Sequence, residues 1–119
     1  MIEATQLEES LRKEIARKNY VLAVILAQKR GCQESEIRHL QELALKQMAC
    51  EYRNGSAVRK LAREWGFSKA DLESVLRAAL DDYERMSDKK RQEQCYDVKT
   101  GKYLTLRQWV DHFWEAKER

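Results

Sequence analysis

Proline is absent from the 119 residues, and there are only four glycines. Because proline breaks helices and glycine weakens them, little in this chain interrupts a helix. Hydrophobic residues make up 43% of the chain and charged residues 36%, a composition typical of a globular protein with a charged surface. A chain of this length can bury a continuous core without disulfides or a structural metal, so we expect one helical domain over residues 1–119.

Long hydrophobic runs are also absent. The longest, Tyr20–Ala27, is far short of the roughly 20 residues that a membrane-spanning helix needs, and no cleavable leader precedes it. We therefore expect a cytoplasmic protein without a membrane partner. The three cysteines, Cys32, Cys50 and Cys95, cannot all pair within one chain and have no metal-ligand spacing, so we expect reduced thiols and neither a metal nor a cofactor.

Catalytic signatures are missing as well. The sequence contains no glycine-rich phosphate loop, no G-x-S-x-G elbow and no H-E-x-x-H motif. His39 and His112 are far apart and have no ligand at metal spacing, and no histidine is placed by sequence to activate Cys32. We interpret all three as ordinary side chains and expect that the protein is not an enzyme.

The N-terminal third predicts one long helix. Thr5 and Glu8 have capping-box spacing, apolar residues follow at four-residue intervals as far as Ile15, and Gly31 can end the helix in the left-handed conformation. The run Tyr20–Ala27 is apolar nearly all round. It therefore either packs in the core of this chain or covers a dimer contact.

The middle of the chain predicts three helices. The first runs over Ile37–Tyr52 after a Ser35 cap, and Asn54-Gly55 closes it. Ser56 then caps a short helix that ends near Trp65, and Gly66 turns the chain. Ser68 and Asp71 form an S-x-x-D cap for a helix with one apolar stripe that reaches Tyr83.

The C-terminal part predicts a hairpin and a final helix. Residues 84–94 are almost all polar and suit either an exposed helical extension or a linker. Tyr96–Val98 and Lys102–Leu104 flank Thr100-Gly101 as in a β-hairpin, and Thr105 with Gln108 caps a helix whose aromatic face we assign to the core. The predicted class is all-α, with a tri-helical core over 34–83, a long N-terminal helix and a hairpin–helix unit over 95–119.

One segment, Ser56–Leu80, resembles the helix-turn-helix of resolvases, transposases, sigma factors and many repressors. Ala62 stands where two helices approach closely, and Gly66, four residues on, stands where the turn needs a residue without a Cβ. Leu72 and Val75 match the residues that anchor the second helix to the first. The resemblance covers about a quarter of the chain and implies a fold in which the helix Ile37–Tyr52 completes the core.

This resemblance implies a site for double-stranded DNA. In such folds the second helix lies in the major groove and the first crosses the phosphate backbone. Ser56–Leu80 has five basic and three acidic residues, a net charge of +2. The residues that would contact phosphates or bases are Arg59, Lys60, Arg63, Ser68, Lys69, Asp71, Glu73, Ser74 and Arg77.

Two functions follow from the same segment. The first is a small DNA-binding regulator that acts as a homodimer. The basic run Lys89–Arg91 is either a solvated stretch or a further phosphate contact. The second is a helical adaptor that binds another protein and no DNA, because helix-turn-helix geometry is also a stable way to pack three helices. Asp71 and Glu73 favour the adaptor, since carboxylates repel phosphate and read a base only by accepting from cytosine.

Overall fold

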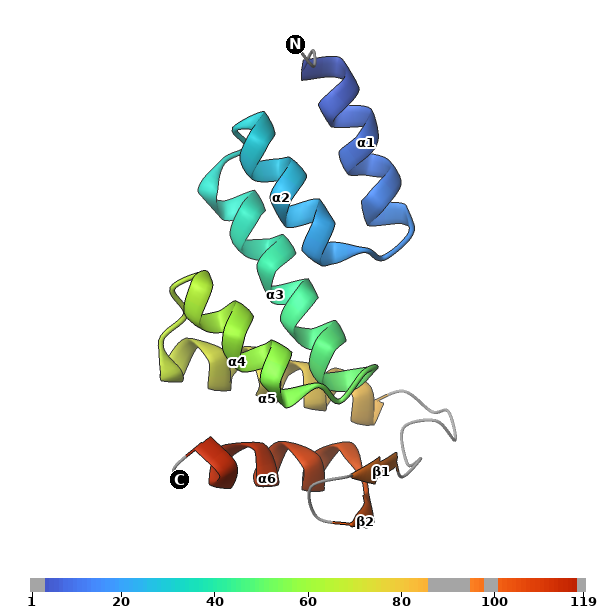
Figure 1. Ribbon diagram of the computed structural model, residues 1–119, viewed down its shortest axis with the longest axis vertical. Helices are drawn as coiled ribbons and strands as arrows, with labels where there is room; N and C mark the ends of the chain where they lie inside the picture. Colours follow the sequence, from blue (N-terminus) through green and yellow to red (C-terminus); the bar gives the residue numbers. More distant parts are fainter. Residues whose placement is uncertain (1–3, 86–94, 98–100, 118–119) are drawn as a thin grey trace. The chain divides into compact units, whose positions relative to one another are not determined.

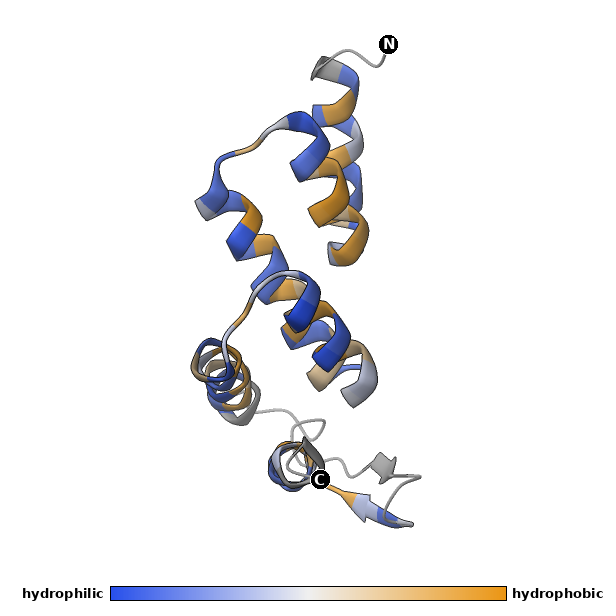
Figure 2. Cartoon of the chain, turned by 60° about the vertical axis from the view of Figure 1, so that its left-hand side comes forward, coloured by the Kyte–Doolittle hydropathy of each residue, from blue (hydrophilic) through white to orange (hydrophobic). Residues whose placement is uncertain are grey.

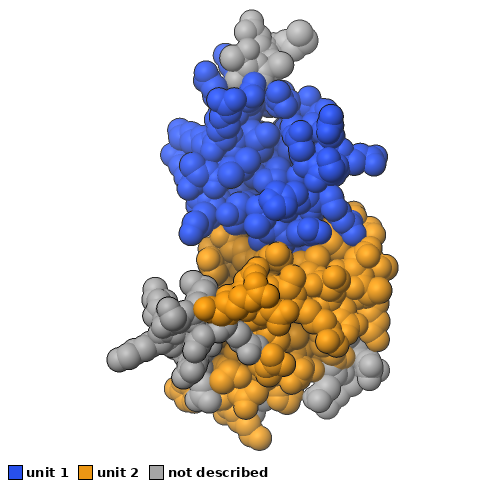
Figure 3. All heavy atoms as spheres, turned by 180° about the vertical axis from the view of Figure 1, so that it is seen from behind, with its two compact units in different colours: residues 1–45 blue, residues 46–119 orange. Residues whose placement is uncertain are grey.

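The computed structural model describes residues 4–85, 95–97 and 101–117, which are mostly helical (Figure 1). The chain divides into two compact units, residues 1–45 and 46–119 (Figure 3), and the boundary between them falls within α3. Because helices predominate among the described residues, the predicted all-α class is confirmed. In chain order the elements are α1 Ala4–Ala16, α2 Tyr20–Arg30, α3 Glu34–Cys50, α4 Gly55–Glu64, α5 Lys69–Arg85, β1 Cys95–Asp97, β2 Lys102–Leu104 and α6 Leu106–Lys117.

The predicted long N-terminal helix is wrong, because two helices, α1 and α2, occupy that stretch. Lys18 has a φ of 61° and breaks the helix. Asn19 fixes the break: its carbonyl accepts from the Ala23 N–H at 3.0 Å, and its side-chain amide donates to Glu14 Oε2 at 3.1 Å. The turn lets α1 and α2 pack side by side (Figure 1), with Ala23 fully buried. A helix folded back in this way buries apolar surface that one continuous helix would leave in water.

The end of α2 follows the prediction. Gly31 has a φ of 79°, and the N–H of Cys32 donates to the Ala27 carbonyl at 3.0 Å, as in a Schellman motif. The start of α3 does not follow it. The Gln33 carbonyl accepts from the Ile37 N–H at 3.1 Å, so Gln33 precedes the first turn and Ser35 lies inside the helix.

The junction between α3 and α4 also differs from the prediction. Arg53, with a φ of 51°, takes the left-handed conformation that we assigned to Asn54-Gly55. Asn54 instead caps α4, because its side chain accepts from the Ala57 N–H at 3.1 Å, and Ser56 lies in the first turn. A Cβ on Gly55 would lie 3.4 Å from Phe113 Cδ2, so this glycine lets α4 begin close against α6.

A hairpin and α6 close the C-terminal unit. The strands β1 and β2 pair antiparallel, with Tyr96 opposite Tyr103. The predicted capping box is confirmed: the Gln108 N–H donates to Thr105 Oγ1 at 3.2 Å, and the Thr105 N–H donates to Gln108 Oε1 at 2.9 Å. Along α6, Phe113 is buried and its ring centroid lies 5.7 Å from that of the buried Trp109. The aromatic face therefore belongs to the core, as predicted.

Two sequence interpretations fall beyond this description. Residues 86–94, which include the basic run Lys89–Arg91, lie outside the described residues, although α5 itself extends through Arg85.

Among the helices that the structure describes, none combines the length and the apolar character needed to cross a bilayer.

Candidate nucleic-acid interface

A sharp turn joins α4 to α5 at Gly66. The Phe67 N–H donates to the Ala62 carbonyl at 2.9 Å and the Gly66 N–H to the Arg63 carbonyl at 3.2 Å, which is again a Schellman arrangement. Gly66 has a φ of 71°, and a Cβ placed on it would meet nothing within 4 Å. Backbone conformation, and not lack of space, is therefore the reason for a glycine here.

The second helix begins where the sequence predicts. Ser68 Oγ accepts from the Asp71 N–H at 3.0 Å, and the Ser68 carbonyl accepts from the Leu72 N–H at 2.9 Å. This cap satisfies one backbone donor of the first turn, which the helix itself cannot satisfy. The Ser68 hydroxyl is therefore engaged in holding the start of α5.

The inner faces of α4 and α5 are buried. Ala62 is only 4% exposed, and Val58 on the same helix is fully buried. Leu72 and Val75, which the resemblance gives as anchors of the second helix, are buried as well. Burial of one stripe on each helix fixes which residues face outward.

Seven of the nine predicted site residues are exposed on α4, on the turn or on α5, and the other two, Arg59 and Glu73, are half-buried. The structure thus presents the polar side of α5 together with two basic residues of α4. The exposed seven are Lys60, Arg63, Ser68, Lys69, Asp71, Ser74 and Arg77.

Arg59 is turned toward α6. Its Nη2 donates to the Phe113 carbonyl at 3.0 Å, and its guanidinium carbon lies 4.4 Å from the centre of the Phe113 ring. The Arg59 Nε is buried and finds no acceptor among the described residues. Arg59 therefore holds α6 against α4, in a position different from the phosphate-facing one that we predicted.

Glu73, in the second turn of α5, is paired with Arg77. Arg77 donates to Glu73 Oε1 from both Nη2, at 2.8 Å, and Nε, at 3.1 Å. The pair links successive turns of one helix at a four-residue spacing. It offsets the charge of Glu73, so this carboxylate opposes a nearby phosphate less than an isolated one would.

Sequence reasoning missed a second arginine that ties the C-terminal unit together. Arg53 Nη1 donates to the Leu104 carbonyl at 3.1 Å, 51 residues away in the sequence. The sequence signal nearest to Arg53 is the Asn54-Gly55 turn, which we interpreted only as the end of a helix. Among the described residues no group of three His, Cys, Asp or Glu side chains could hold a metal ion.

Comparison with known proteins adds no relative. Neither the protein-family models, the curated proteins nor the solved structures give a significant match to this chain.

Proposed function

We propose that this chain is a small DNA-binding regulatory protein that places the first turns of α5 in the major groove of double-stranded DNA. The observation that carries the proposal is the turn at Gly66, which joins two helices with buried inner faces and leaves the outer side of α5 exposed. Lys69 and Ser74 lie on that side. The first turns of such a helix are the part that reaches base edges.

Basic residues on α4 supply the phosphate contacts in this proposal. Lys60 and Arg63 are exposed and stand three residues apart, on one side of the helix. Cations on the first helix of the motif fit its position across the backbone. Because Arg59 is engaged with Phe113, we leave it out of the interface.

We further propose that the protein acts as a homodimer through α2. Apolar residues cover most of this helix (Figure 2), and Leu22 and Ile25, one turn apart, are 37% and 44% exposed. The aromatic residues Trp109 and Phe113 of α6 are buried in the core, so they do not offer such a contact. A self-complementary α2 face would give the two-fold symmetry that paired half-sites need.

The test is a titration of mixed-sequence duplex DNA by fluorescence anisotropy at several salt concentrations. We expect the logarithm of the binding constant to fall linearly with the logarithm of the salt concentration. The double variant Lys60→Ala/Arg63→Ala should lower that slope by about 2, whereas Lys13→Ala, an exposed charge on α1, should leave it unchanged. Absence of binding at low salt, or a binding constant that salt does not affect, would remove the proposal.

The second candidate is a protein-interaction adaptor. The exposed Leu22 and Ile25 favour it, because paired apolar residues on a surface helix are typical of a contact with another polypeptide. Light scattering separates the two readings. If Ile25→Asp turns a dimer into a monomer and weakens DNA binding, α2 pairs two copies. A wild-type monomer without DNA affinity supports the adaptor.

A further inference from the structure

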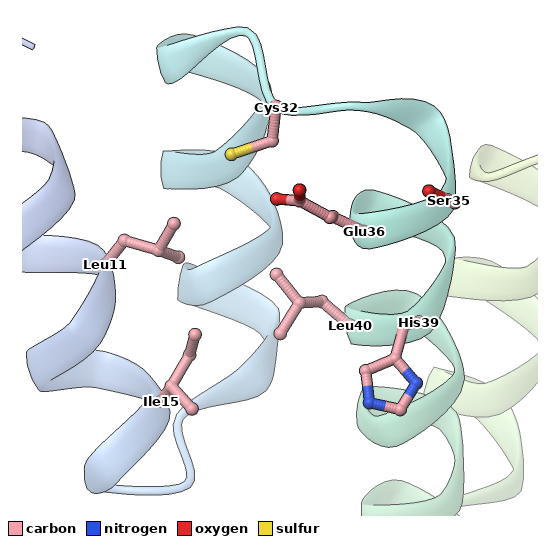
Figure 4. Close-up of a pocket in the computed structure, with 7 residues that line it drawn as sticks. All are labelled: Leu11, Ile15, Cys32, Ser35, Glu36, His39 and Leu40. Carbon is pink, nitrogen blue, oxygen red and sulfur yellow. The ribbon is translucent and has the colours of Figure 1, made fainter.

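We draw no further inference here: the strongest candidate, the open groove between α1 and α3 of the N-terminal unit (Figure 4), is edged by solvent-exposed Glu36 and His39 and by charges that balance, and nothing in the structure shows what occupies it.

Discussion

Arg59 contacts Phe113 twice, through a 3.0 Å hydrogen bond to its carbonyl and through a guanidinium that lies 4.4 Å from the centre of its ring. The two residues are 54 positions apart in the sequence. The carbonyl lies near the C-terminal end of α6, where the helix dipole attracts cations. One side chain of α4 thus contacts both the backbone of α6 and its aromatic face.

Replacing Arg59 should therefore reduce stability. We expect Arg59→Ala to lower the free energy of unfolding by about 2 kcal/mol, because a hydrogen bond from a charged donor and a ring contact are both lost. Arg59→Lys should recover only part of this, since an ammonium cannot lie flat on the ring and donate at the same time. Urea unfolding measures the effect, with the exposed Lys60→Ala as control. A loss no larger than that of the control would mean that the Phe113 contact contributes nothing.

Gly66 gives a second prediction about stability. The space around it is open, so Gly66→Ala should cost only the strain of a side chain at a φ of 71°, about 1 kcal/mol. Gly66→Asn should cost less, because asparagine tolerates this conformation. Thermal unfolding of the three proteins provides the comparison. If alanine and asparagine prove equally harmful, the backbone conformation at the turn is not the cause.

Local signals in the sequence were sufficient for three features of the C-terminal unit. The Ser68 cap, the Gly66 turn and the Thr105–Gln108 box were all predicted, because each depends on residues within a few positions of one another. The break at Lys18 was not, since neither glycine nor proline marks it and packing of α1 on α2 favours it.

The position of Arg59 could not be predicted for a related reason. On an isolated α4 it has the same helical spacing as an exposed phosphate-binding residue. Its partner Phe113 comes from a helix that the sequence does not place against α4.

Cys50 predicts a loss of stability at alkaline pH. Burial raises the pKa of its thiol to about 11, against a smaller opposing effect of the Arg53 charge. The folded protein therefore keeps a proton that the unfolded chain loses near its ordinary pKa, so stability falls as pH rises from about 9 to about 11. The contribution is about 3 kcal/mol at most. The difference between wild-type and Cys50→Ala unfolding free energies, measured across this range, should show it. A difference that stays constant with pH would contradict it.

Glu73 provides a sharper test of the proposed interface. Its carboxylate holds Arg77 through two hydrogen bonds and adds a negative charge to the side of α5 that would face DNA. Glu73→Gln removes that charge and releases Arg77 to reach a phosphate, so binding to mixed-sequence DNA should tighten about threefold to tenfold at low salt and show a steeper salt dependence. Glu64→Gln, an exposed acid at the end of α4, removes the same charge without releasing an arginine of α5 and should have a smaller effect. Anisotropy titrations at two salt concentrations distinguish these outcomes. Weaker binding by Glu73→Gln would instead indicate that the carboxylate itself contacts a base, with cytosine as its partner.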